Sequence, residues 1–299
     1  MTSPALQEVV ALLGCPAAGN PAQYLFERMI AAAGLDWRFV TLDVHPDRIA
    51  EAIHGAAAMG FRGCLLSGPL RAAALAAVAS ASPAATFAGA VSLIERQPTG
   101  LAGHMTDGRG TLEALRAHVD PTGESVLIIG AGAAARATAV ELSLSGVGEI
   151  VVCDRTTERA AALVEALNGM AAAPASAIPW EEAVAIPERV GIVVAAVPAD
   201  GPKPVLSLSG LRPDLVVADL AMVSQPAPVV TAARAAGACA VDGLEIHSER
   251  TAIGADPAST PAVLRSRIIA TQGLAWRQAT AEGLPLEKPL EGIDTQGML

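Results

Sequence analysis

The sequence predicts a two-domain α/β protein. Apolar, β-branched runs alternate with helical patterns along most of the chain, which is typical of parallel sheets covered by helices. A glycine turn at 130–132 joins one such run to an Ala-rich helical pattern. A second glycine-rich piece, 100–110, separates two alternating series. We place the boundary near residue 110, so that 1–110 and 111–242 form the two domains and 243–299 packs back on the first.

The first domain begins with a strand-helix-strand-helix-strand order. Val9–Leu13 is a short apolar run, and Asn20 and Pro21 supply an N-cap and a first-turn proline for a helix that runs to about Ala33. The same alternation predicts a strand at 37–44, a helix at 47–59, a strand at 63–67, an Ala-rich helix after Arg71, and a strand at 87–94.

The centre of the second domain is predicted from a strand, a tight turn and a helix. Val126–Ile129 runs into Gly130-Ala131-Gly132, and Ala133–Leu144 continues as a helix. The first glycine permits the turn, the second lets the backbone approach a pyrophosphate, and the helix N-terminus offers free N–H groups to phosphates. This pattern predicts a Rossmann-like dinucleotide-binding domain, although a glycine turn that serves only packing has the same sequence.

The next strand strengthens the prediction of dinucleotide binding. Glu149–Cys153 is followed by Asp154-Arg155-Thr156, about twenty residues beyond the glycines. A residue that binds the adenosine ribose is expected at this distance. The remaining pattern completes a doubly wound series: a helix at 158–168, an irregular Pro-rich stretch at 174–187, strands at 191–197 and 215–219, a helix at 229–236, and a strand at 239–241. Beyond Gly243 the pattern weakens, and one helix is expected at 262–270.

Composition excludes several classes of function. The formal net charge is −10 and no basic run gathers the Lys and Arg residues, so nucleic acid is not an expected partner. The segment 72–94 is uncharged and long enough to span a bilayer, but its Ser, Pro and Gly residues favour a helix, a turn and a strand, so no membrane partner is expected. The four cysteines and the histidines show no metal-ligand spacing, so we expect no metal. The cysteines lie far apart in the sequence and the first residues lack a basic n-region, so we expect a cytoplasmic protein.

Taken together, several short sequence motifs between about Leu12 and Leu244 resemble those of the shikimate and quinate dehydrogenase family. Gly89-Ala90-Val91, Gly103 to Gly108, Gly130 to Arg136, and the Gly243-Leu244 pair each resemble a family motif. The resemblance implies an N-terminal substrate-binding domain, a Rossmann-like domain that binds NAD or NADP, and an active site in the cleft between them. It also implies a small-molecule substrate, and a homodimer is possible.

The resemblance also assigns catalytic residues. Asp107 falls on the family's aspartate, which moves a proton together with a lysine, and Arg71 stands in the place of that lysine. An arginine keeps a positive charge and can orient an oxygen, but its high pKa makes it a poor proton shuttle. Asn20, Ser67 and Ser92 are the candidate substrate-binding residues. Most other polyol-binding groups are changed, and Arg250 stands where the family has a glutamine.

The cofactor preference is divided. Asp154 suits the ribose hydroxyl of NAD, whereas Arg155 and Thr156 are the pair that reads the 2′-phosphate of NADP. The candidate cofactor-binding residues are Gly130, Ala131, Gly132, Ala133, Ala134, Ala135, Arg136, Asp154, Arg155, Thr156 and Gly243.

Two hypotheses follow. The first is an NAD(P)-dependent oxidoreductase that acts on an alcohol or ketone, with Asp107 as acid and base and Arg71 positioning the oxygen; its substrate is shikimate or a related hydroxy acid in a strongly altered pocket. The second is a non-catalytic descendant that binds a dinucleotide or a small ligand. Position 71 discriminates between them.

Overall fold

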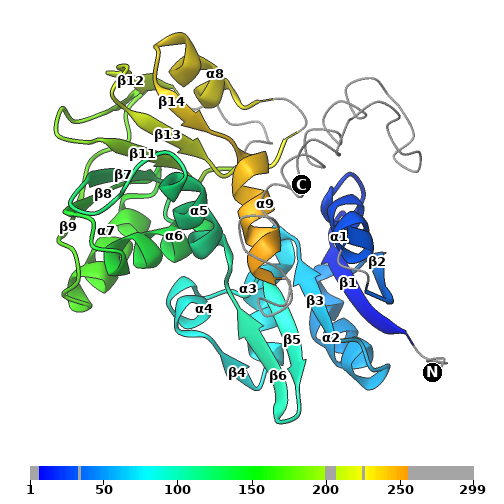
Figure 1. The fold of residues 1–299 in the computed structure, drawn as a ribbon. Helices are drawn as coiled ribbons and strands as arrows, with labels where there is room; N and C mark the ends of the chain where they lie inside the picture. The colour runs from blue at the N-terminus through cyan, green and yellow to red at the C-terminus, as the bar shows by residue number, and fades with distance from the viewer. Residues whose placement is uncertain (1–6, 33–34, 199–206, 224–225, 255–299) are drawn as a thin grey trace, which may run out of the picture.

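The computed structural model describes residues 7–32, 35–198, 207–223 and 226–254. The chain forms two α/β units, each built on a six-stranded sheet, and helix α9 (Gly243–Gly254) lies between them (Figure 1). The predicted two-domain α/β architecture is therefore confirmed.

The first sheet has the strand order β2-β1-β3-β5-β6-β4. Alternate side chains of its first strand face opposite layers: Ala11 and Leu13 pack into one hydrophobic cluster, and Val10 and Leu12 into another. The strands are β1 (Glu8–Gly14), β2 (Trp37–Asp43), β3 (Gly63–Leu66), β4 (Ser80–Ala81), β5 (Leu93–Gln97) and β6 (Gly100–His104), with β5 antiparallel to β3 and β6. The helices are α1 (Ala22–Ala32), α2 (Ile49–Ala58), α3 (Arg71–Ala74) and α4 (Pro83–Ala88), with 3-10 turns at Pro46–Arg48, Gly68–Leu70 and Leu75–Ala77.

The strand predicted at 87–94 is wrong over residues 87–92. Phe87 belongs to α4, and β5 begins only at Leu93. The Ser82 hydroxyl caps α4 by accepting from the Ala85 amide at 3.2 Å, and Gly89 ends the helix in the left-handed region with φ 68°. Both ends of this short helix are thus determined by local capping, which the apolar run concealed. The Ala-rich helix after Arg71 is likewise shorter than its composition predicted.

The second sheet is entirely parallel, with the order β14-β13-β11-β7-β8-β9. Its central strands are buried on both faces: Ile128 packs into one cluster and Leu127 into the other. The strands are β7 (Ser125–Ile129), β8 (Glu149–Cys153), β9 (Ala175–Ala177), β11 (Ile192–Ala195), β13 (Val216–Asp219) and β14 (Cys239–Val241). The helices are α6 (Ala133–Leu144), α7 (Thr157–Gly169) and α8 (Pro228–Ala235), and β10 (Val184–Ala185) pairs with β12 (Leu208–Ser209) in a small separate sheet.

Two helices at the junction position the site. Helix α5 (Asp107–Arg116) lies against α6 and α9 (Figure 1). A Cβ on Gly108 would collide with the Ala137 carbonyl of α6, and one on Gly110 would lie 3.0 Å from the Arg250 Cα of α9. These glycines therefore allow α5 to approach both helices closely. Helix α9 was not predicted, and the helix expected at 262–270 lies outside the described residues.

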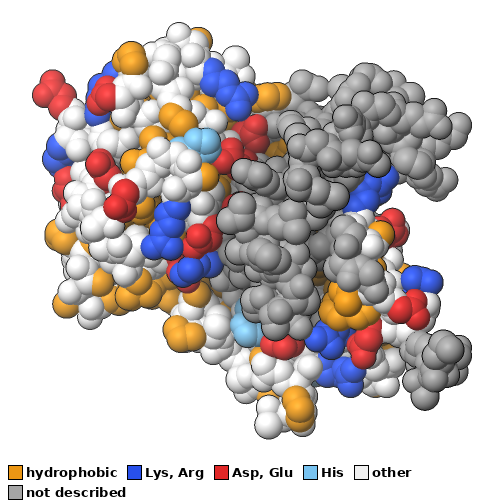
Figure 2. Space-filling model, viewed as in Figure 1, with side chains coloured by type: hydrophobic (Ala, Val, Ile, Leu, Met, Phe, Trp, Pro, Cys, Tyr) orange, Lys and Arg blue, Asp and Glu red, His pale blue; other side chains and the backbone are white. Residues whose placement is uncertain are grey.

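The described residues contain neither a membrane-spanning helix nor a cluster of metal ligands. None of the helices there is long and apolar enough to cross a membrane. Over the same residues, the His, Cys, Asp and Glu side chains form no group of three or more that could hold a metal ion. On the face shown in Figure 2, acidic and basic side chains are interspersed rather than gathered into one basic patch.

Candidate active site

A cavity of about 230 Å³ lies between the two domains. Loops and helices of the first domain supply one wall, and α6 and α9 contribute the other. Its lining residues are Leu12, Asn20, Ala22, Leu65, Leu66, Ser67, Gly68, Arg71, Asp107, Ala134, Leu220, Met222, Gly243, Ile246, His247 and Arg250.

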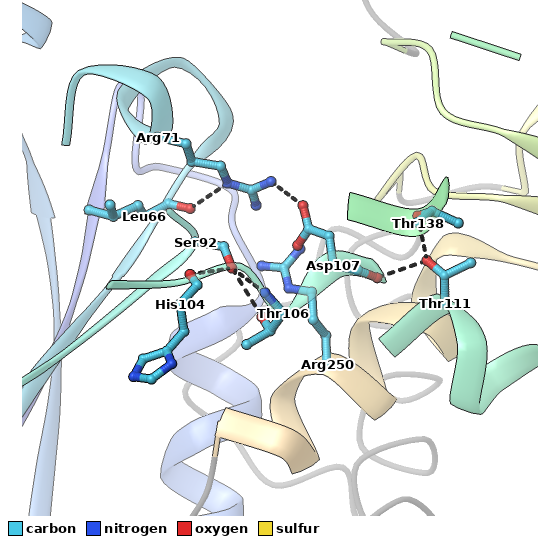
Figure 3. Close-up of polar contacts among 9 residues, drawn as sticks. All are labelled: Leu66, Arg71, Ser92, His104, Thr106, Asp107, Thr111, Thr138 and Arg250. Carbon is cyan, nitrogen blue, oxygen red and sulfur yellow. Dashed lines mark hydrogen bonds and ion pairs between the residues drawn. The ribbon is translucent and has the colours of Figure 1, made fainter. Parts of the chain in front are cut away.

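Asp107 is held between two arginines at one end of this cavity (Figure 3). Arg71 donates from Nη1 to Asp107 Oδ2, and its Nε donates to the Leu66 carbonyl at 3.0 Å. Arg250 Nη1 lies 2.8 Å from Asp107 Oδ1, which is an ion-pair distance, yet its approach is not aligned as a hydrogen bond. The Asp107 side chain is only 5% exposed. Asp107 Oδ1 therefore has a charged neighbour but no aligned donor among the described residues.

The charges at this end of the cavity are unequal. Burial alone would raise the pKa of Asp107, but the guanidinium groups of Arg250 and Arg71 outweigh it and lower that pKa below its ordinary value. Burial, assisted by Arg250, lowers the pKa of His247 to about 3, so its imidazole is neutral at pH 7. Two guanidinium groups thus face one carboxylate and one neutral imidazole, and this end carries a net positive charge.

The structure brings two of the three predicted substrate-binding residues to the cavity. Asn20 and Ser67 both line it. Each side chain also holds the backbone, since Asn20 Oδ1 accepts from the Ala22 amide at 2.9 Å and Ser67 Oγ accepts from the Cys15 amide at 3.2 Å.

Ser92, the third of them, is not among the lining residues. Its side chain is buried, and its Oγ accepts from the Thr106 amide at 2.9 Å and lies 3.0 Å from Thr106 Oγ1 (Figure 3). Thr106 directly precedes Asp107, so these bonds fix the turn that delivers the Asp107 carboxylate to the cavity.

The predicted dinucleotide loop has the geometry that a pyrophosphate needs. Helix α6 begins at Ala133, directly after Gly132, and no side chain caps it. The N–H groups of its first turn, at Ala133, Ala134 and Ala135, therefore have no partner within the helix and face the loop. Gly130 adopts φ 110° and is followed by Ala131, so the turn is as tight as the sequence predicted.

Asp154 stands at the end of β8, beside this loop. Its Oδ2 accepts from the Ala131 amide at 2.7 Å, and its Oδ1 accepts from the Thr156 amide at 2.8 Å. A carboxylate has further lone pairs, so it can still accept from a ribose hydroxyl. The exposed Arg155 lies with its guanidinium 4.9 Å from the centre of the Trp180 ring. The residues present therefore fit a nicotinamide dinucleotide.

Two other predicted cofactor residues lie at the domain junction. Arg136 donates from Nε and Nη2 to the Phe87 carbonyl, at 3.0 and 2.8 Å, and its guanidinium lies 5.2 Å from the Phe87 ring centre. It thus ties α6 of the second domain to α4 of the first. Gly243 begins α9 and lines the cavity.

Two site residues were missed as functional groups from the sequence, His247 and Arg250. Both lie on α9 and line the cavity. Their spacing of three residues places them on one face of a helix, and they follow the Gly243-Leu244 pair closely. A helix that lies between two domains has no single apolar face, so its sequence gave no strong helical period.

Comparisons with known proteins agree with this arrangement. Residues 12–94 match the family model of the shikimate dehydrogenase substrate binding domain, and residues 113–238 match that of shikimate / quinate 5-dehydrogenase. A shikimate dehydrogenase (NADP(+)) of Acidiphilium cryptum is 35% identical over 78% of this chain and 83% of its own length.

Solved structures give the same result. The ligand-free 5-ketofructose reductase of Gluconobacter sp. strain CHM43 is 28% identical, with a TM-score of 0.78 over 89% of this chain and 99% of its own. Shikimate 5-dehydrogenase from Listeria monocytogenes, in complex with shikimate and NAD, is 25% identical, with a TM-score of 0.77 over 90% of this chain and 99% of its own. With both domains matched and a curated relative 35% identical over 78% of the chain, the chain belongs to the shikimate dehydrogenase family.

Proposed function

We propose that the chain transfers a hydride between a nicotinamide dinucleotide and a small alcohol or ketone in the cavity between its domains. The observation that carries this proposal is the Asp107 carboxylate, buried between Arg71 and Arg250 in a cavity that reaches α6 and Gly243. The reaction class named for the relatives supports it. The family membership, the uncapped N-terminus of α6 and Asp154 point to the same cofactor class.

In this proposal Asp107 moves the proton and Arg71 holds the oxygen. The nicotinamide, when bound, supplies or accepts the hydride. Asp107 is ionised at neutral pH, and its Oδ1 lacks an aligned donor, so it is ready to accept a hydrogen bond and then a proton from a substrate hydroxyl. Arg71 is anchored through Leu66, and its fixed positive charge stabilises the negative charge that develops on the substrate oxygen.

Replacing Arg71 with lysine tests whether position 71 limits turnover. A lysine amine can exchange its proton, whereas a guanidinium cannot, so Arg71→Lys is expected to raise kcat by roughly tenfold or more. Steady-state kinetics on an active alcohol or ketone provide the measurement. Arg71→Gln is the matched control, and it should lower kcat because no positive charge remains. Equal, measurable turnover in all three proteins would show that position 71 does not limit the reaction, whereas no turnover in any of them would favour the second candidate, a ligand-binding protein without hydride chemistry.

We further propose that the cofactor is NAD rather than NADP. Both oxygens of Asp154 are fixed by backbone N–H groups, so the carboxylate cannot turn away from a 2′-phosphate placed at the end of β8. The negative charges of the Asp154 carboxylate and of the 2′-phosphate would repel each other, which disfavours NADP.

Asp154→Asn should therefore change the cofactor preference. We expect the ratio of the NADH and NADPH dissociation constants to move toward NADPH by roughly tenfold, because the negative charge is removed while one backbone hydrogen bond is retained. Fluorescence titration with each dinucleotide measures the ratio. An unchanged ratio would show that Asp154 does not read the ribose.

A further inference from the structure

We infer that the cavity takes a 2-oxo or 2-hydroxy carboxylate with a short apolar side chain, rather than a polyhydroxylated ring. This inference rests on the proposed function, and it names the substrate class of that same site. Three observations carry it: the charge at the Asp107 end, the position of both arginines on one carboxylate, and the apolar remainder of the wall.

The charge at the Asp107 end favours an anion. Among the described lining residues the cations are Arg71 and Arg250, and Asp107 offsets one of them. A guanidinium has five N–H groups, and the described contacts of Arg71 use two of them, to Leu66 and Asp107. The described ion pair of Arg250 involves only its Nη1. Within the described contacts both arginines therefore keep donors for a second carboxylate, which a guanidinium binds with a two-pronged geometry.

The geometry places that carboxylate next to the reacting carbon. In the proposed function the substrate oxygen lies at Asp107 and Arg71. Arg71 and Arg250 contact opposite oxygens of this same Asp107 carboxylate (Figure 3), so a substrate carboxylate bound to either guanidinium lies within one guanidinium's reach of the reacting oxygen. A carboxylate attached directly to the carbinol or carbonyl carbon satisfies both contacts.

The rest of the wall disfavours hydroxyl groups. Away from the arginines the cavity is lined mainly by apolar side chains, and the two polar ones, Asn20 and Ser67, already accept backbone N–H groups. The Asn20 amide and the Ser67 hydroxyl can still donate, but two side chains cannot replace the water around a ring that carries several hydroxyl groups. A volume of about 230 Å³ also limits the substrate to a short side chain. The apolar side chains that would contact it are Leu12, Ala22, Leu65, Leu220, Met222 and Ile246.

The test compares a 2-oxo acid with its own amide. Calorimetry of the whole chain, with NAD⁺ present so that the oxo compounds cannot be reduced, measures the dissociation constants of 4-methyl-2-oxopentanoate, of the corresponding amide, and of 3-dehydroshikimate, and oxidation of NADH by each is followed separately. We expect the acid to bind roughly tenfold to a hundredfold more tightly than the amide, because it gains a charged hydrogen-bonded pair. Arg250→Gln, which restores the residue type of the family, should bring this ratio close to one.

Arg109→Gln is the matched control, because Arg109 lies on α5 near Asp107 but is half exposed and pairs with Glu113. It should leave the acid-to-amide ratio unchanged. Equal binding of acid and amide, or tighter binding of 3-dehydroshikimate than of the 2-oxo acid, would overturn the inference while leaving the proposed function intact. Selective binding of the 2-oxo acid without oxidation of NADH would support the anion site and contradict the proposed hydride transfer.

Discussion

An Asp107→Asn variant is expected to lose turnover by a factor of roughly 10² to 10⁴, the usual contribution of a positioned acid or base. The amide keeps the shape of the carboxylate but cannot accept the proton of the substrate hydroxyl. Binding of the dinucleotide should be largely kept, because the described contacts of Asp107 are with Arg71 and Arg250 and not with Gly132 or Asp154. Steady-state kinetics and a dinucleotide titration on the same preparation measure the two properties.

The same variant is also expected to be less stable. It leaves the largely buried guanidinium groups of Arg71 and Arg250 without their anion, at a cost of about 3 kcal/mol in the free energy of unfolding. The folded-state pKa of Asp107 is lowered, so the stability that its ionisation provides is present above about pH 4, the ordinary pKa, and is lost as the pH falls through the folded-state value. Denaturant unfolding should therefore show that the wild-type chain has a larger free energy of unfolding than Asp107→Asn. This difference should be constant near neutral pH and become smaller in acid.

Asp47→Asn is the control, because the Asp47 side chain is 87% exposed and lies far from the cavity lining. It should change neither turnover nor stability measurably. Wild-type turnover in Asp107→Asn would show that the proton moves through another group.

A Gly132→Asp variant is expected to lose dinucleotide binding by at least about a hundredfold. Gly132 precedes the first turn of α6, and a carboxylate there would repel the pyrophosphate and occupy the N–H groups that bind it. The change should not unfold the chain. Gly132 has φ −76°, which any residue adopts, and an added Cβ would lie 3.4 Å from its nearest neighbour, Arg159 Nη2. Aspartate is also a preferred N-cap residue, so thermal stability should be kept or raised.

Gly132→Ala separates charge from size in this experiment. Its methyl group should weaken binding far less than the carboxylate does, as measured by fluorescence titration with NADH. Undiminished binding to a folded Gly132→Asp protein would mean that the dinucleotide does not use the N-terminus of α6.

The sequence predicted the second domain more accurately than the first. The bounds predicted for α6 and β8 agree with the structure, because buried parallel strands are continuous apolar runs and the glycine turn marks where one ends. The first domain contains short elements such as α4, whose ends depend on Ser82 and Gly89 and not on a repeating pattern. A window of apolar residues cannot reveal such capping.

The site was predicted only in part. Arg71 and Asp107 were found through the family resemblance, and the structure places them in direct contact. The resemblance placed Arg250 at a family glutamine but gave it no role, and His247 was not singled out, because α9 carries no clear hydrophobic period and its place beside α5 depends on the close packing that Gly110 allows. The family resemblance suggested that Ser92 contacts the substrate. In the structure its hydroxyl oxygen accepts from the Thr106 amide, a contact that the sequence position did not indicate.

Titration of the wild-type chain with NADH and NADPH, separately and by calorimetry, decides whether the cavity and the loop at Gly132 bind a dinucleotide. We expect saturable binding at one site per chain, with NADH bound more tightly than NADPH because of Asp154. Binding of neither dinucleotide would contradict the proposed hydride chemistry and leave a family fold that serves another task.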